Sequence, residues 1–152
     1  MSTEFDNSRR QPMIRLLSTA FDAFADELER RLADTPYNDI RISHGCVFGT
    51  IDPDGSRLTD LATRARMTKQ SVGEVTSDLE QRGYLERVPD PSDGRAKIIR
   101  LTDRGRAAQA LGRDVIDEIE REWAERFGEE RIAAFRDALE SITAEQLAGM
   151  PA

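Results

Sequence analysis

The sequence predicts a mainly α-helical protein that carries one small β-hairpin. Apolar residues recur at three- and four-residue spacing through most of the 152 residues, which is the periodicity of amphipathic helices. Between residues 84 and 102, two short strand-forming runs flank a turn that contains Pro91 and Gly94. Two short helical segments, 58–66 and 68–81, lie immediately before this hairpin. Helix, turn, helix and hairpin in this order is the organisation of a winged helix-turn-helix, a module that binds duplex DNA.

Further helices are predicted on both sides of this module. A first amphipathic helix spans about 12–33, and a shorter one spans about 38–50. After the hairpin, a long helix covers 102–127, Gly128 interrupts it, and a last helix covers 130–148. The first and last helices each carry an apolar stripe opposite strongly charged faces.

These outer helices indicate a domain organisation with two parts. We expect residues 12–36 and 107–148 to form a helical dimerisation region, and residues 38–106 to form the winged helix-turn-helix. A central module of about 50 residues offers little core for the apolar stripes to cover, so packing against a second copy is favoured. A dimer also joins two weak half-site contacts, ~34 Å apart along the duplex, into one strong contact. The alternative is that these helices fold back onto their own module as ordinary core.

The charge distribution separates the predicted module from the rest of the chain. The formal net charge is −7, but residues 57–106 contain 11 Lys and Arg against 8 Asp and Glu, whereas the remainder contains 11 against 21. Because salt screens charges beyond ~8–10 Å, affinity for phosphate depends on the local field of the docking face. The acidic remainder would repel DNA from the other faces of the protein.

The composition argues against several classes of function. One Cys and one His exclude an intrachain disulfide framework and a zinc site built from those ligands alone. The sequence has no Ser-His-Asp order and no Gly-rich phosphate loop, so we expect neither enzymatic activity nor a cofactor. No apolar run approaches the ~18 residues that span a bilayer, and the N-terminal residues lack an apolar signal core. We therefore expect a cytoplasmic protein with no membrane partner.

The second helix of the module, about 68–81, is the predicted recognition helix. Val72, Val75 and Leu79 share one face and should pack inward, which leaves the opposite face for the major groove. Thr68 is placed as the N-cap, and polar side chains near the helix start can reach base edges or phosphates. The residues predicted to contact DNA from this helix and the segment before it are Arg64, Arg66, Thr68, Lys69, Gln70, Ser71, Gly73, Glu74 and Ser77.

The wing, about 84–102, is predicted to contact DNA beside the recognition helix. Arg95 at its tip is the strongest single candidate, because the negative potential of the minor groove attracts arginine. Asp93 is placed to brace the Arg95 guanidinium through a bidentate pair. Lys97, like Arg64 and Arg66, is a candidate phosphate contact that positions the protein without reading sequence.

Residues 57–105 resemble the winged helix-turn-helix of the MarR (multiple antibiotic resistance regulator) family. The most specific match is a wing pattern, D-x-R followed by L-T-x-x-G, which this chain meets with Asp93, Arg95, Leu101, Thr102 and Gly105. The flanking helices also fit the family plan, so the resemblance covers about 12–148. One departure is Gly94, where many members carry another Arg or a polar residue, and this reduces the expected contacts of the wing with the DNA backbone.

The resemblance implies a homodimeric, usually repressive transcription factor. Such proteins release a palindromic operator when a small, often aromatic ligand binds, or when a cysteine is oxidised. By the family pattern, Arg95 would enter the minor groove and residues 69–77 the major groove. The implied partners are a double-stranded DNA operator, a second copy of the chain and a small-molecule effector of unknown identity.

Candidate effector contacts lie in the first two helices. In the family plan the ligand crevice lies between the dimer helices and the DNA-binding module. The candidate residues are Phe21, Phe24, His44, Cys46 and Phe48. Each also has a plainer interpretation: His44 as a partly buried, hydrogen-bonded histidine, and the aromatic residues as core.

Two other functions are compatible with the sequence. Cys46 could act as a thiol redox switch, but no Lys or Arg lies one helical turn away to lower its pKa. The redox-sensing members of the family usually carry their cysteine in the first helix, where this chain has none. The second alternative is a winged helix that serves protein–protein contact and has no DNA target.

Overall fold

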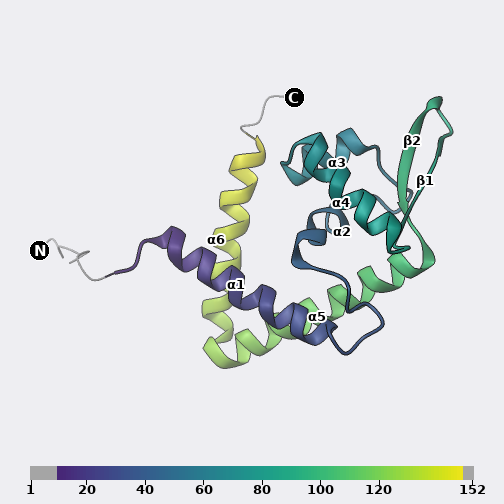
Figure 1. The fold of residues 1–152 in the computed structure, drawn as a ribbon. Helices are drawn as coiled ribbons and strands as arrows, with labels where there is room; N and C mark the ends of the chain where they lie inside the picture. Colours follow the sequence, from purple (N-terminus) through teal and green to yellow (C-terminus); the bar gives the residue numbers. More distant parts are fainter. Residues whose placement is uncertain (1–9, 149–152) are drawn as a thin grey trace, which may run out of the picture. The chain divides into compact units, whose positions relative to one another are not determined.

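The computed structural model describes residues 10–148 and confirms the predicted fold class, mainly helices with one antiparallel hairpin (Figure 1). The elements in chain order are α1 (Met13–Leu32), η2 (Ile42–His44), α2 (Gly45–Phe48), α3 (Leu58–Ala65), α4 (Lys69–Gln81), β1 (Leu85–Asp90), β2 (Asp93–Leu101), α5 (Asp103–Phe127) and α6 (Glu129–Ala148). The chain forms two compact units, one ending at Gly112 and the other beginning at Arg113, so α5 contributes to both. None of the helices within residues 10–148 combines the length and the apolar character needed to cross a bilayer.

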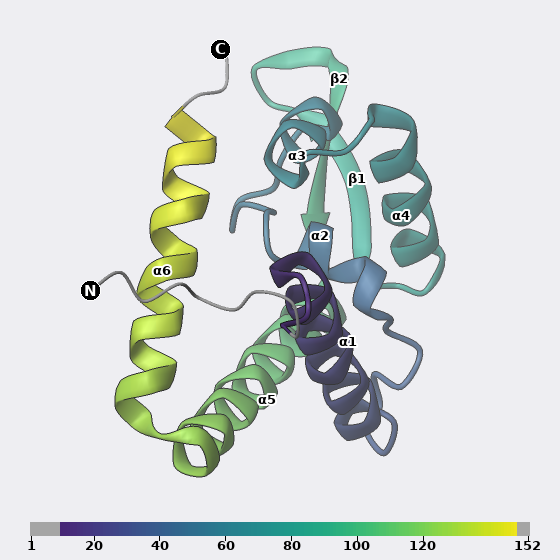
Figure 2. The ribbon, with the colours of Figure 1, turned by 90° about the vertical axis from the view of Figure 1, so that its left-hand side faces the viewer.

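The wing is an antiparallel pair of strands that lies within the range predicted for it, about 84–102. Its register runs from Leu85 opposite Leu101 to Pro89 opposite Lys97, and it shifts between Pro89 and Asp90. Ser56, which precedes α3, forms a bridge with Ile99 and so attaches the hairpin to the helix-turn-helix. In Figure 2 the two strands are seen between α3 and α4.

The first unit has a single apolar cluster beneath the helix-turn-helix and the wing. Its buried members are Val47, Ile51, Leu61, Ala62, Val72, Leu79, Tyr84, Leu85, Ile99, Leu101 and Ala108. The inward face predicted for α4 is confirmed, with Val72 and Leu79 fully buried and Val75 partly buried against the cluster. Thr76 is also buried, which is possible because its hydroxyl donates to the carbonyl of Gly73 at 3.0 Å.

Tyr84 joins the recognition helix, the wing and α5 at one point. Its backbone N–H donates to Leu79 at the end of α4, and its carbonyl accepts the N–H of Thr102 just before α5. Its buried hydroxyl donates to Asp39 and accepts from Arg104, whose guanidinium lies 4.6 Å from the ring centroid. Burial, together with the Asp39 carboxylate, raises the pKa of Tyr84 to about 12. The phenol therefore stays neutral and continues to donate.

The helix predicted over 38–50 is shorter in the structure. Arg41 is extended, and its backbone N–H donates to Nδ1 of His44 at 3.0 Å, so helical geometry begins only at Ile42. Upstream, the Asp39 side chain is held by Tyr84 from the distant end of the module. A tertiary contact therefore overrides the helical periodicity of this segment.

The long helices agree closely with the predicted bounds. Pro12 directly precedes α1, and Gly128, at a φ of 102°, separates α5 from α6. In the second unit, Trp123 and Phe127 pack edge to face, and Arg136 of α6 forms an ion pair with Glu120 of α5.

Two glycines of α5 provide a matched stability test. A methyl group on Gly105 would lie 2.0 Å from the carbonyl oxygen of Tyr84, whereas one on Gly112 would meet nothing within 4 Å. We expect Gly105→Ala to lower the free energy of unfolding by about 1–3 kcal/mol through overpacking. Gly112→Ala should raise it by about 0.5–1 kcal/mol, because alanine is the better helix former. Urea unfolding measures both, and equal stability of Gly105→Ala and wild type would contradict the close contact.

Candidate nucleic-acid interface

The recognition helix α4 begins with a side-chain cap. Oγ1 of Thr68 accepts the backbone N–H of Ser71 at 3.1 Å, and the two hydroxyl oxygens lie 2.8 Å apart. The predicted N-cap is therefore confirmed, and the Ser71 hydroxyl is part of it. Lys69 and Gln70 are exposed in the first turn, at the positive end of the helix dipole. They are the side chains that this helix start presents to solvent.

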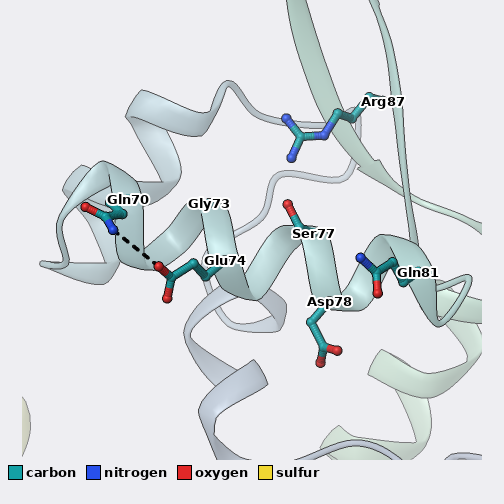
Figure 3. A pocket seen from close by; sticks show the side chains of 7 residues that line it. All are labelled: Gln70, Gly73, Glu74, Ser77, Asp78, Gln81 and Arg87. Carbon is teal, nitrogen blue, oxygen red and sulfur yellow. Dashed lines mark hydrogen bonds between the residues drawn. The ribbon is translucent and has the colours of Figure 1, made fainter.

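A hollow on α4 gathers polar side chains from the helix and the wing (Figure 3). Its lining residues are Gln70, Gly73, Glu74, Ser77, Asp78, Gln81 and Arg87. Four of these, Gln70, Gly73, Glu74 and Ser77, are predicted DNA contacts, and the structure brings them to one side of the helix. Nε2 of Gln70 donates to Oε1 of Glu74 at 3.4 Å, as drawn in Figure 3. The pair thus presents mainly acceptor atoms, which suit the amine of a cytosine or an adenine.

The sequence analysis missed the contribution of Arg87 to this hollow. Nε of Arg87, on β1, donates to Oε2 of Glu80 on α4 at 3.0 Å. The bond attaches the first wing strand to the recognition helix. The available signal was the strand alternation, which places Arg87 on the same face as the buried Leu85, opposite to Glu86 and Val88. Its partner on another element could not be read from that pattern.

At the tip of the wing, Arg95 is exposed and Asp93 contacts its backbone. Oδ1 of Asp93 accepts the N–H of Arg95 at 3.1 Å, and the Arg95 guanidinium makes no hydrogen bond or ion pair with residues 10–148. The expected bidentate pair between the two side chains is therefore wrong for this structure. The short aspartate side chain instead closes a turn onto the amide two residues ahead. The guanidinium is left available for an external partner.

Ion pairing divides the basic residues of the module into two groups. Those paired with an acidic side chain are Arg57, Arg64, Arg82, Arg87, Arg100, Arg104 and Arg106. Within residues 57–106, all of which the structure describes, Arg66, Lys69, Arg95 and Lys97 make no such pair and are exposed. These four lie just before α4, on its first turn and on the wing. The unpaired positive charge is therefore concentrated on the predicted DNA-binding elements.

Arg64 differs from the other predicted phosphate contacts. Its guanidinium donates to the carbonyl of Thr50 at 2.8 Å and pairs with Asp52 at 2.8 Å. This pairing lowers the pKa of the Asp52 carboxyl. Arg64 therefore holds the turn that precedes α3, and any contact with phosphate would compete with that role.

A second carboxylate, Asp90, is engaged where β1 ends. Oδ1 accepts the backbone N–H and the hydroxyl of Ser92 at 2.8 and 2.7 Å, and Oδ2 accepts Nε of Arg57 at 2.8 Å. These bonds, with Ser92 the larger contributor, lower the pKa of Asp90 to about 2. The charged form therefore predominates at neutral pH. No local pattern predicts this contact, because Arg57 lies 33 residues away in the sequence.

The candidate effector residues are not gathered in the hollow on α4. His44 is buried, with Nδ1 accepting from Arg41 and Nε2 donating to Asp78 at 2.8 Å, so its plainer interpretation as a hydrogen-bonded histidine is confirmed. Phe48 packs edge to face against Tyr84. On α1, Phe21 is exposed and Phe24 is partly buried.

Cys46 is a half-buried thiol, and burial raises its pKa. Its Sγ donates to the carbonyl of Ser43 at 3.1 Å. Both features favour the unreactive thiol over the thiolate. Among residues 10–148, no three His, Cys, Asp or Glu side chains are grouped so that they could hold a metal ion.

Residues 44–96, which contain the helix-turn-helix and most of the wing, match the sequence model of the MarR family. Over these residues the chain is therefore similar to the MarR family. One relative is the HTH-type transcriptional regulator BilQ of Clostridioides difficile (strain CD3), which is 34% identical over 68 residues. The match covers 43% of this chain and 46% of BilQ, so it spans less than half of that relative.

Solved structures with the MarR-type fold resemble a larger part of the chain. FabT of Streptococcus pneumoniae, solved in complex with DNA, has a TM-score of 0.74 at 20% identity and covers 90% of this chain and 96% of FabT. CouR of Rhodococcus jostii RHA1, bound to p-coumaroyl-CoA, has a TM-score of 0.67 at 24% identity and covers 84% of this chain and 88% of CouR. At these identities the likeness establishes the fold shared with MarR-family proteins.

The raised pKa of Cys46 predicts a slowly reacting thiol. At pH 7.5 we expect iodoacetamide to alkylate native Cys46 several-fold more slowly than glutathione, because less thiolate is present. Urea should remove the difference by exposing the side chain. Since the chain has one cysteine, mass spectrometry reports this site alone, with Cys46→Ser as the blank. A native rate above that of glutathione would instead favour the redox-switch alternative.

Proposed function

We propose that this protein is a transcriptional regulator of the MarR type that binds duplex DNA as a homodimer and is released by a small ligand. The observation that carries the proposal is the distribution of unpaired cations. Arg66, Lys69, Arg95 and Lys97 are exposed and unpaired within the described chain, although acidic residues are abundant in the sequence. Exposed cations on one recognition helix and its wing are suited to phosphates and base edges.

The recognition helix has the properties required of an element that enters the major groove. A methyl group on Gly73 would meet only Cδ2 of Leu58, at 3.8 Å, so the fold itself has room for alanine there. A glycine that costs helix stability is accounted for if a DNA backbone approaches closely from outside. Gln70 and Glu74 lie beside Gly73 in the hollow and supply the polar atoms that read base edges.

In this proposal the wing contacts the minor groove through Arg95. The bond from the Arg95 amide to Asp93 orders the tip, while the guanidinium itself has no partner within residues 10–148. Lys97, which is exposed on the same strand, would contact phosphate together with Arg66. Gly94 adds no side chain to these contacts, so Arg95 would make most of the contribution of the wing to DNA binding.

The proposed dimer rests on apolar side chains that the monomer leaves exposed. On α1 these are Met13, Ile14, Leu16, Leu17 and Phe21, and on α6 they are Phe135, Leu139 and Ile142. Such stripes are unusual for a monomer in water and typical of an interface. Residues 12–36 and 107–148 would therefore form the dimerisation region, and a twofold axis would match a palindromic operator.

The remaining part of the proposal is release by a small ligand. It is supported by the fold shared with CouR, which was solved bound to p-coumaroyl-CoA. An aromatic effector would contact the side chains named above, Phe21, Phe24, His44, Cys46 and Phe48. It would act as a derepressor only by binding more tightly to the arrangement that does not fit the operator.

DNA binding through the wing is tested with operator duplexes selected from random DNA. By fluorescence anisotropy, Arg95→Ala should weaken operator binding by about 1–3 kcal/mol, because it removes a groove contact. Lys97→Ala should weaken binding to duplexes of any sequence by a similar factor. It should also reduce the slope of log affinity against log salt concentration by about one per protomer. Arg113→Ala, which removes an exposed charge outside the module, is the matched control.

Two outcomes of this experiment would count against the proposal. Unchanged binding of Arg95→Ala would remove the wing from the interface. If wild type enriched no sequence and its binding hardly depended on salt, the alternative of a protein–protein module would be preferred.

Dimerisation is tested by placing a charge in the apolar stripe. Ile142→Asp should shift sedimentation toward the monomer and weaken operator binding together, because a buried unpaired carboxylate disfavours association. Ser141→Asp, exposed on the other side of α6, should leave both unchanged. A dimer that persists with Ile142→Asp would place the interface elsewhere.

A further inference from the structure

The wing carries one carboxylate that is buried, whereas the other acidic side chains of the hairpin are exposed or partly exposed. Asp90 is 5% exposed, and all of its acceptor contacts go to two residues, Ser92 and Arg57. Nε and Nη2 of Arg57 both donate to Oδ2, while Oδ1 takes the amide and the hydroxyl of Ser92. We call this group of three residues the wing clamp.

The wing clamp connects the helix-turn-helix to the tip of the wing. Arg57 is the residue immediately before α3, and Asp90 is the last residue of β1. The strand register shifts between Pro89 and Asp90, so the regular ladder ends there. Ser92 then leads into Asp93, whose side chain holds the amide of Arg95. Hydrogen bonds, together with the peptide bond between Ser92 and Asp93, therefore connect the start of α3 to the backbone of Arg95.

The rest of the hairpin does not need this clamp to form. Below the register shift, the ladder from Leu85–Leu101 to Pro89–Lys97 is complete, and the Ser56–Ile99 bridge attaches it to the module. The clamp therefore acts beyond the register shift, where only the pair of Asp90 and Asp93 continues the ladder. It lies directly before the segment that carries Arg95.

We propose that Asp90, held by Arg57, is a positioning residue for DNA binding: it aims the wing tip so that Arg95 reaches the groove beside the recognition helix. This inference rests on the proposed function. It assigns a favourable role to a negative charge on an element that approaches a polyanion. The Arg57 charge beside it compensates that negative charge, so the clamp is close to neutral toward DNA.

The sign of the mutational effect distinguishes positioning from simple electrostatics. Neutralising a carboxylate near DNA should by itself strengthen binding, because phosphate repulsion is removed. If Asp90 positions Arg95, Asp90→Asn should weaken binding instead, since an amide cannot accept the same four donors as an ion pair. The two explanations therefore predict opposite changes.

The hairpin offers a matched control pair. Arg100 and Glu86 face each other across the strands, with Nε of Arg100 donating to Oε1 of Glu86 at 2.6 Å. The two arginines are similarly exposed, at 43% for Arg57 and 48% for Arg100, but Glu86 is itself exposed and lies away from the tip. Arg100→Ala and Glu86→Gln remove one positive and one negative charge from the hairpin without touching the wing clamp.

The first experiment measures operator affinity of these four variants by fluorescence anisotropy. We expect Asp90→Asn and Arg57→Ala to bind about tenfold more weakly than wild type, a loss comparable to that of a groove contact. Glu86→Gln should bind as tightly as wild type or more tightly. Circular dichroism and urea unfolding check the fold. Arg57→Ala, which truncates the exposed partner, keeps the test valid if Asp90→Asn is unstable.

A double-mutant cycle with Arg95→Ala identifies what the clamp acts through. In the Arg95→Ala background, Asp90→Asn and Arg57→Ala should weaken operator binding by less than about twofold, because the Arg95 contact through which they act is already absent. If Arg57 instead contacted phosphate directly, Arg57→Ala would weaken operator binding equally in the Arg95→Ala background. The slope of log affinity against log salt concentration would then also fall by about one per protomer.

The outcomes separate the clamp from the proposed function. If wild type binds its operator and Asp90→Asn binds equally or more tightly, or if the losses simply add to that of Arg95→Ala, the positioning role is overturned and DNA binding stands. If wild type prefers no duplex, the proposed function fails and the clamp fails with it.

Discussion

The buried tyrosine at the end of the recognition helix is the constraint on which the module depends. Tyr84 receives hydrogen bonds from the start of α5, donates to the end of α4 and to Asp39, and begins the path into β1. Four segments thus meet at one residue that is completely removed from water. Because interiors are close-packed, a displacement of any one segment requires displacement of the others. The recognition helix and the wing are consequently held at a defined spacing, which groove binding requires.

An acidic protein can present a positive surface because its charges are sorted by contact. Most arginines of the module neutralise carboxylates nearby, as Arg87 does with Glu80 and Arg100 with Glu86. Exposed pairs of this kind contribute only ~0–1 kcal/mol to stability, so their main consequence is electrostatic. They cancel charges that would otherwise repel phosphate, and they leave the unpaired cations of α4 and the wing to determine the local field.

Features encoded by neighbouring residues were predictable, and features that depend on distant partners were not. The bounds of α3 and α4, the Thr68 cap and the break at Gly128 follow from periodicity, capping and glycine placement, each of which acts within one helical turn. The segment 38–50 carries the same periodicity but loses its first turn, because Asp39 bonds to a tyrosine 45 residues away. For Asp93 the predicted partner residue, Arg95, is correct, but the carboxylate contacts the backbone amide of Arg95 and not its guanidinium. The short aspartate side chain favours the nearby amide.

The sequence by itself determined the type of module, the inward face of the recognition helix and the candidate DNA contacts. Only the tertiary structure decided which of the cations are available: the guanidinium of Arg64 is held by Asp52 and that of Arg57 by Asp90, whereas that of Arg95 has no partner within the described chain. The physical reason is that ionic contacts form between groups that are close in space, at separations along the chain that no local pattern records. Hydrophobic periodicity sets the elements, and the way they pack selects the charges that remain unpaired on the proposed DNA-binding surface.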